Sequence, residues 1–204
     1  VHVLTNGYPQ HTTAPKPKPS RKPDDELVLI HAGSFLGSRL TQSPDLLLEP
    51  LLHNLSGQLS SGVVQLIGPL SNNEMAIIEP FKSRFAAIGW RIECPGSLPR
   101  SEVLALLPKA DGLLLLSASH AALPSKLFEY IPTGRPRGGG TQKGSATGNI
   151  CALLPQATLI EAATGSVTPD LAYQTPCYEK PAFQIPPEFC ARSLAQTFKS
   201  VTNL

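Results

Sequence analysis

A lysine and a glutamate lie three residues apart in the run Pro124-Ser-Lys-Leu-Phe-Glu-Tyr130. The run follows an apolar segment and opens with Pro and Ser, which is typical of a helix amino terminus. Free backbone N–H groups and the helix dipole favour an anion there, and Lys126 adds a full positive charge. Glu129 is expected to project from nearly the same face of the helix. One helix end thus offers donors for a phosphate and an acceptor for hydroxyl groups, which suits a nucleoside diphosphate.

The elements that must position these residues alternate regularly from Leu27 onward. We expect strands at 27–30, 62–67, 90–92 and 112–116, and helices at 45–56, 73–87, 99–107 and 125–131. This alternation predicts an α/β fold, a doubly wound parallel sheet of Rossmann-like type with helices on both faces. Ligands of such sheets bind beyond the carboxyl ends of the strands, where Gly33, Gly68, Gly96 and the loop before Ser125 fall.

The pattern weakens after Pro136. The run 137–144 is predicted not to form a strand, because Arg137 followed by three glycines supplies no apolar side chains to bury. We therefore expect the sheet to be shortened there, or its edge to be distorted. A late strand is predicted at 157–161, irregular structure at 164–190 and a terminal helix at 191–201.

Composition narrows the class of protein. An apolar fraction of 41% is typical of a globular domain, and a net charge of +2 does not favour nucleic acid as a partner. The absence of a long apolar run and of a leader pattern at the start predicts a cytoplasmic protein without a transmembrane segment. The four cysteines form no C-x-x-C pair, so we expect free thiols and no metal site.

Four motifs occur in an order that resembles a known family. They are Thr5–Tyr8, Gly33–Arg39, Gly96–Arg100, and Pro124–Tyr130 followed by Gly134-Arg-Pro136. Together they resemble the carboxyl-terminal, donor-binding domain of retaining glycosyltransferases of the GT-B fold, of the family 4 type. The last motif is the most specific one, and the match covers roughly residues 1–8 and 27–136.

The resemblance implies a role for each matching residue. Arg39 and Lys126 would be the catalytic cations that stabilise the diphosphate leaving group of a UDP- or GDP-sugar, without a metal or other cofactor. Glu129 would accept hydrogen bonds from the ribose hydroxyls. The nucleotide-sugar-binding residues would be Gly33, Ser34, Gly96, Ser97, Leu98, Ser125, Leu127 and Glu129.

The resemblance also implies a domain plan. Residues 1–8 would be the remnant of an interdomain junction, 9–26 a Pro- and Lys-rich linker, 27–163 the Rossmann-like nucleotide-sugar-binding domain and 164–204 an irregular carboxyl-terminal segment with a terminal helix. A full enzyme of this kind has an amino-terminal domain that binds the acceptor, and this domain is the expected partner of the chain. Through that domain a full enzyme could also contact a membrane surface. Without that domain the chain is expected to bind the donor and to catalyse little.

Other interpretations stay open from the residues. Many relatives carry a glutamate where this chain has Ala121. His120 could face the donor sugar or could have no role in the site. Lys126 and Glu129 alone would suit an exposed charge pair, and Arg39 an ordinary surface residue. The alternatives to an enzyme half are a non-catalytic nucleotide-binding or scaffold domain, a GT-B-like sugar epimerase fragment, or a phosphate-binding α/β domain of another family.

Overall fold

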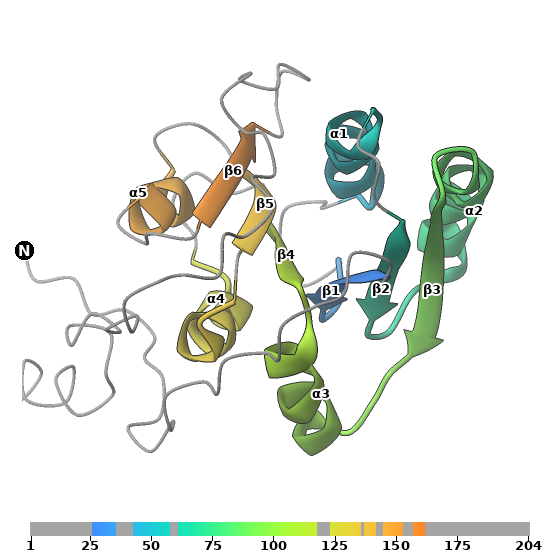
Figure 1. Cartoon of the computed structure of the whole chain (residues 1–204). Coiled ribbons are helices and arrows are strands. Elements are labelled where there is room, and N and C mark those ends of the chain that lie inside the picture. Colours follow the sequence, from blue (N-terminus) through green and yellow to red (C-terminus); the bar gives the residue numbers. More distant parts are fainter. Residues whose placement is uncertain are drawn as a thin grey trace, which may run out of the picture.

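The computed structural model of the chain describes residues 26–35, 43–57, 61–117, 123–135, 137–141, 145–152 and 157–161. These residues form one six-stranded sheet in the order β3-β2-β1-β4-β5-β6, and every strand pair is parallel (Figure 1). The strands are β1 (Leu27–Ala32), β2 (Gly62–Ile67), β3 (Trp90–Gly96), β4 (Gly112–Ser117), β5 (Arg137–Thr141) and β6 (Ala157–Glu161). The helices are α1 (Asp45–Leu55), α2 (Asn72–Ala86), α3 (Arg100–Leu106), α4 (Ser125–Tyr130) and α5 (Ala146–Ala152). The predicted α/β, Rossmann-like fold is confirmed.

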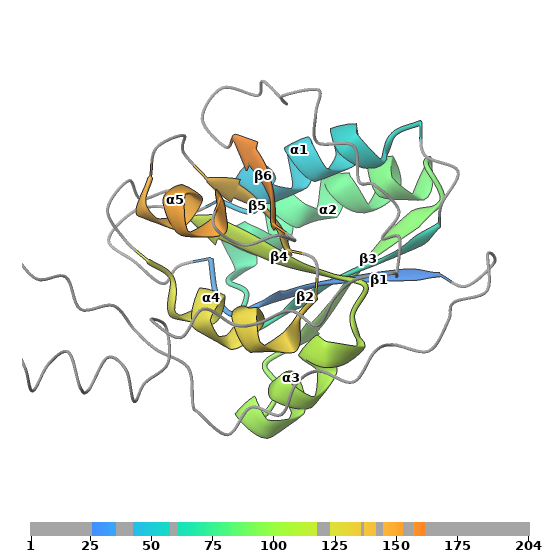
Figure 2. The same ribbon diagram turned by 60° about the vertical axis from the view of Figure 1, so that its left-hand side comes forward.

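Helices lie on both faces of the sheet. Figure 2 shows α1 and α2 above the sheet, and α3 and α4 below it. The strand β4 explains why both faces are covered, since its four consecutive leucines point alternately to opposite sides. Leu114 and Leu116 pack in the core under α1 and α2, whereas Leu113 and Leu115 pack in the core against α4.

The strand β5 corrects the expectation for the glycine-rich run. Arg137–Thr141 pairs with β4 on one side and with β6 on the other, so the prediction that this run forms no strand was wrong. A strand inside a sheet is held by backbone hydrogen bonds to both neighbours, and glycines supply these as well as other residues do. In the ladder with β4, the glycines Gly138–Gly140 are paired with the leucines 114–116. Arg137 itself is buried, which lowers the pKa of its guanidinium to about 10.

The remaining element predictions are met within a few residues. The late strand at 157–161 is confirmed as β6, and β1 and β3 run two and four residues further than expected. The helix α5 was not predicted. The linker at 9–26, apart from Glu26, the junction at 1–8 and the segment at 164–204 lie outside the described residues. In the part of the chain that the structure describes, no helix is long and apolar enough to span a membrane.

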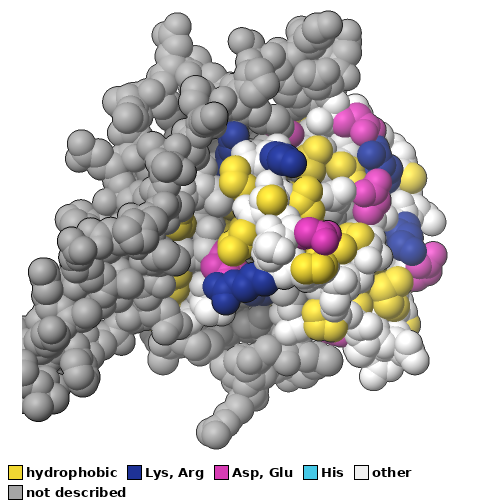
Figure 3. All heavy atoms as spheres, turned by 90° about the horizontal axis from the view of Figure 1, so that it is seen from below, with side chains coloured by type: hydrophobic (Ala, Val, Ile, Leu, Met, Phe, Trp, Pro, Cys, Tyr) yellow, Lys and Arg dark blue, Asp and Glu magenta, His cyan; other side chains and the backbone are white. Residues whose placement is uncertain are grey.

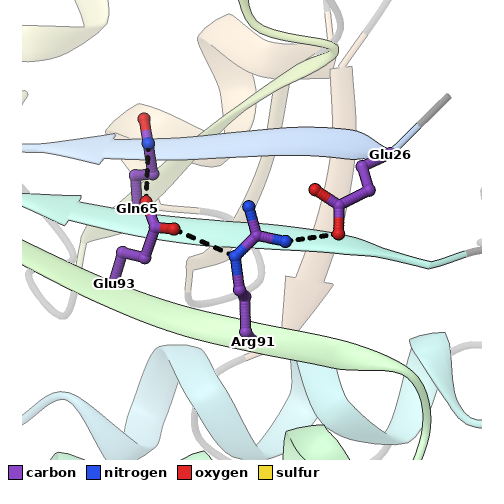
Figure 4. A network of polar contacts seen from close by, with 4 residues as sticks. All are labelled: Glu26, Gln65, Arg91 and Glu93. Atoms are coloured by element: carbon purple, nitrogen blue, oxygen red, sulfur yellow. Dashed lines mark hydrogen bonds and ion pairs between the residues drawn. The ribbon is translucent and has the colours of Figure 1, made fainter.

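The edge strand β3 carries a polar network on the face of the sheet that α1 and α2 do not cover. Arg91 donates hydrogen bonds to Glu93, at 2.9 Å, and to Glu26, while Gln65 of β2 donates to Glu93 at 2.9 Å (Figure 4). The bond to Arg91 lowers the pKa of Glu26, and the bonds to Gln65 and then to Arg91 lower that of Glu93. Charged, mutually paired side chains of this kind suit an exposed sheet edge, because they discourage pairing with another chain.

The surface seen from below mixes charges of both signs. Basic and acidic side chains alternate with apolar ones over the described part of that face (Figure 3). Polar groups are instead brought together at the carboxyl ends of the strands.

Candidate functional site

The strands β1 and β4 separate toward their carboxyl ends. Their ladder contains only the pairs Leu29↔Gly112 and Ile30↔Leu113, although β1 pairs with β2 along its whole length. The order of the strands reverses at this point, because the chain runs outward from β1 to β3 and then returns to β4. Such a switch point is where parallel α/β sheets bind their ligands.

Two buried side chains bridge the separated strands. The Tyr130 hydroxyl accepts a hydrogen bond from Ala32 N at 2.8 Å and lies 3.3 Å from Leu114 O, to which it donates. Nδ1 of His31 lies 3.0 Å from the same carbonyl oxygen, so Nδ1 carries a proton and donates it. Burial raises the pKa of the Tyr130 phenol, which therefore stays protonated at neutral pH. The side chains of Tyr130 and His31 thus bond to Ala32 N and Leu114 O, two backbone groups that the β1–β4 ladder does not pair.

Lys126 reaches from α4 to the end of β1. Its Nζ lies 3.3 Å from Nε2 of His31 and 3.5 Å from Ser34 O. Burial lowers the pKa of this lysine to about 8, and no carboxylate among the described residues forms an ion pair with it. Burial, and then the charge of Lys126, lowers the pKa of His31 well below its ordinary value. The imidazole is therefore neutral, and its Nε2 accepts from the ammonium.

Gly33 allows the lysine to lie where it does. The backbone of Gly33 has φ +114°, and a Cβ built on it would lie 3.2 Å from Lys126 Nζ and 3.3 Å from its Cε. Both the backbone conformation and the close approach favour glycine at this position.

Glu129 pairs with a residue of another helix. Its Oε1 lies 2.8 Å from Nη2 of Arg100, at the start of α3, and the Arg100 side chain is 77% exposed. The interpretation of Lys126 and Glu129 as one exposed charge pair therefore does not describe this chain. Arg100 is the last residue of the motif Gly96–Arg100, so this ion pair brings that motif beside the motif Pro124–Tyr130. The sequence predicts both motifs to contribute to one site.

The glycines at the carboxyl ends of the first three strands lie side by side. Gly33 N donates to Ile67 O at 2.7 Å, and Gly68 N donates to Gly96 O at 3.0 Å. A Cβ on Gly68 would lie 2.7 Å from Gly33 O, so this edge is built for close backbone contact. The expected convergence of these strand ends at one edge is thus what the sheet produces.

The other predicted residues have different surroundings. Ser34 presents its carbonyl oxygen to Lys126, and Ser125 is exposed at the start of α4. Leu98 is partly buried against the core below the sheet, with Ser97 just before it. The side chain of Leu127 is fully buried in that core, and its N–H donates to Pro124 O at 3.0 Å. Arg39, His120 and Ala121 lie outside the described residues.

The helix end contributes less than the sequence suggests. The helix α4 has six residues and continues only as a 3₁₀ turn, Ile131–Thr133, and no side chain caps its amino terminus. A helix this short has a weak dipole, so the full charge of Lys126 is the main attraction for an anion. Within the described ranges no cluster of three or more His, Cys, Asp or Glu residues could hold a metal ion.

Two residues of this region were missed as participants. The strand expected at 27–30 leaves His31 just beyond its end and without a role, and Arg100 closes the motif Gly96–Arg100 without a role. A histidine at the end of an otherwise apolar strand, two residues before the strand-end glycine, was the available signal for His31.

No family model and no curated protein matches the chain. Solved structures do resemble it. Anabaena HepE (Alr3699) in complex with UDP and glucose matches with a TM-score of 0.56 and 16% identity, over 88% of this chain and 49% of HepE. A GtfA/B complex matches with a TM-score of 0.58 and 14% identity, over 97% of this chain and 38% of that chain. WaaG, a glycosyltransferase of lipopolysaccharide biosynthesis, matches with a TM-score of 0.51 and 15% identity, over 78% and 42%. The chain spans less than half the length of each of these proteins, and over that part it has the fold of GT-B glycosyltransferases.

Proposed function

We propose that the chain is the donor-binding half of a metal-independent, retaining glycosyltransferase of the family 4 type. One observation carries the proposal. The half-buried side chain of Lys126 places its ammonium at the carboxyl end of β1, next to a neutral imidazole and a carbonyl oxygen, without an ion-paired carboxylate among the described residues. A charge that is partly removed from water among neutral neighbours is costly, and an anionic ligand that pairs with it offsets that cost.

A nucleoside diphosphate has the chemistry that this edge would recognise. At neutral pH a lysine with a pKa of about 8 is mostly charged and attracts the diphosphate. Gly33 leaves the backbone at the end of β1 without a side chain, which favours close approach of a phosphate group. HepE, whose fold the chain shares, has been crystallised with UDP, and this favours UDP over GDP as the nucleotide.

Glu129 is the proposed ribose-binding group. Arg100 binds its Oε1, which fixes the carboxylate at the side of α3 and leaves Oε2 as the proposed acceptor for a ribose hydroxyl. Backbone groups of Gly96 and Ser97 lie at the end of the neighbouring strand and would border the base.

The remaining roles follow from the resemblance stated above. Arg39 is proposed as the second cation on the diphosphate, and the acceptor is proposed to bind to an amino-terminal domain. No cofactor beyond the nucleotide-sugar is proposed, and a cytoplasmic location suits such a donor. Because GT-B chemistry takes place between two domains, the chain alone is expected to bind the donor and to transfer little sugar.

Calorimetry with UDP, GDP and ADP tests this proposal. UDP is expected to bind at pH 7, and Lys126→Ala is expected to weaken binding roughly ten- to a hundredfold, the worth of a charge-assisted hydrogen bond. Lys82→Ala is the matched control, because Lys82 is an exposed lysine of α2 that pairs with Glu79. A folded protein that gives no heat with any of the three nucleotides would refute the proposal.

A non-catalytic nucleotide-binding domain is the second candidate. The sequence at residue 121 favours it, because this chain has Ala121 where many relatives carry a glutamate. Release of UDP from a UDP-sugar, measured with the chain joined to an acceptor-binding half, separates the two candidates. Turnover excludes the second candidate, and tight binding without turnover excludes the first.

A further inference from the structure

His31 is the residue through which the end of β1 contacts the Lys126 side chain. The histidine is 1% exposed, and its ring stacks on Phe35 with a centroid distance of 4.5 Å and an interplanar angle of 11°. Stacking on one side and burial in the sheet leave the imidazole a single orientation. An imidazole held in this way aims its two nitrogens in fixed directions.

The two nitrogens have opposite roles. The contact of Nδ1 with Leu114 O, at 3.0 Å, requires a proton on Nδ1, because a carbonyl oxygen can only accept. In the neutral ring this leaves Nε2 without a proton, as an acceptor directed at Lys126 Nζ at 3.3 Å. The carbonyl of β4 therefore selects the tautomer that can hold the lysine.

We propose that His31 is a positioning residue, whose neutral imidazole accepts a hydrogen bond from Lys126 and holds the ammonium at the carboxyl end of β1 for an anionic ligand. The inference deepens the proposed function and rests on it for the identity of the ligand. The hydrogen bond itself is a property of the free protein.

The surroundings of His31 are consistent with this role. The groups that face it are Lys126 from α4, Leu114 O from β4, the backbone of Gly33, and Phe35 from the loop after β1. The titratable one is Lys126, a cation that disfavours a second proton on the ring. A protonated His31 would lose its acceptor and would repel Lys126.

A structural role for the Nδ1 contact alone is the competing explanation, and two substitutions separate the explanations. In His31→Asn the amide nitrogen can take the place of Nδ1 and bond to Leu114 O, but the side chain is too short to reach Lys126. In His31→Gln the amide oxygen can take the place of Nε2 and accept from Lys126, while the donor to Leu114 O is lost. Leu114 O still accepts from Tyr130 in that variant, so no buried carbonyl is left without a donor.

Binding of UDP to the two variants gives the first readout. His31→Gln is expected to bind UDP with an affinity within about threefold of the wild type. His31→Asn is expected to bind UDP roughly tenfold more weakly than the wild type, because only His31→Asn loses the acceptor for the charged donor Lys126. If binding instead survives in His31→Asn and falls in His31→Gln, His31 acts through Leu114 and the proposal is wrong.

The tautomer of His31 gives the second readout, which needs no ligand. In a ¹⁵N spectrum of the labelled chain, the His31 signals are assigned by their loss in His31→Gln. The proposal requires a protonated Nδ1 and an unprotonated Nε2 at pH 7. A proton on Nε2 would overturn it, whether or not UDP binds. Conversely, a correct tautomer in a protein that binds no nucleotide would refute only the proposed function.

Discussion

Glu129 forms its ion pair with Arg100 of α3, at 2.8 Å, and not with Lys126, three residues earlier on its own helix. The two charged side chains of α4 therefore serve different neighbours. Glu129 holds the start of α3, whereas Lys126 reaches the carboxyl end of β1. This division leaves the ammonium at the switch point of the sheet without an ion-paired carboxylate among the described residues, and an anionic ligand is therefore expected to bind there.

Replacing Lys126 with Met should stabilise the folded protein. The lysine has a pKa of about 8 in the folded state against 10.5 ordinarily, so its charged form is disfavoured by folding. That lowering costs at most about 3 kcal/mol at pH 7. Some of this is offset because His31 and Ser34 O lose a donor, so we expect the free energy of unfolding to rise by about 1–3 kcal/mol. Urea unfolding measures the change.

Lys82→Met is the control for that substitution. It removes an exposed ammonium that pairs with Glu79 on α2, so the free energy of unfolding should hardly change. A Lys126→Met variant that is less stable than the wild type would show that the buried ammonium is favourably solvated by the protein.

Stability and nucleotide affinity should depend on pH in opposite directions. Between about pH 8 and pH 10.5 the unfolded chain keeps the proton of Lys126 while the folded chain has lost it, so stability from this group rises with pH. UDP affinity should fall in that range, by up to about tenfold per pH unit, because the ammonium is lost. The terminal phosphate of UDP is fully ionised well below pH 8, so it adds no change. Titrations with UDP at pH 7, 8 and 9 test this, and a constant affinity would contradict it.

Gly33→Ala should weaken UDP binding as well as destabilise the fold. The backbone at φ +114° is strained for alanine, at a cost of about 1–3 kcal/mol, and the new methyl group would press on Lys126 at 3.2 Å. Gly57→Ala is a matched control, since Gly57 has φ +90° and a Cβ there meets nothing within 4 Å. Both variants should lose stability in thermal unfolding, but only Gly33→Ala should lose affinity for UDP in calorimetry. Equal affinities would mean that the Gly33–Lys126 contact does not bear on binding.

Glu129→Gln tests the proposed ribose contact. If the carboxylate accepts from the ribose, the variant should bind UDP roughly tenfold more weakly and should lose most of its preference for UDP over 2′-deoxyuridine diphosphate, because a neutral amide oxygen accepts more weakly than a carboxylate. Arg100→Ala keeps the carboxylate and should keep the preference. Because the Arg100 side chain is mostly exposed, neither variant should change the free energy of unfolding by more than about 1 kcal/mol. A preference that survives in Glu129→Gln would place the ribose elsewhere.

The fold is well predicted from the sequence where side chains decide the structure. The strand β4 is a run of leucines whose two faces are both buried, and such a run can hardly be anything but an interior parallel strand. The strand β5 was missed for the opposite reason. Backbone pairing with β4 and β6 holds its glycines, and these two partner strands lie elsewhere in the sequence.

The position of the candidate site at the strand ends could be predicted from the sequence, but the directions of its side chains could not. Parallel strands end at one edge, so the proximity of Gly33, Gly68 and Gly96 follows from the alternation of elements. The direction of Lys126 depends on the imidazole of His31, and that of Glu129 depends on Arg100. Both partners come from other elements, and no spacing within 124–130 indicates them.

Binding of a nucleoside diphosphate at the carboxyl ends of β1 and β3 and the start of α4 is the proposal on which the others depend. A titration of the ¹⁵N-labelled chain with UDP, followed by amide chemical shifts, tests it most directly. The largest shifts are expected on Gly33, Ser34, Gly96, Ser97 and Ser125, and in Lys126→Ala they should saturate only at roughly ten- to a hundredfold higher UDP. Saturable shifts confined to other parts of the sheet, or shifts that persist unchanged in Lys126→Ala, would contradict it.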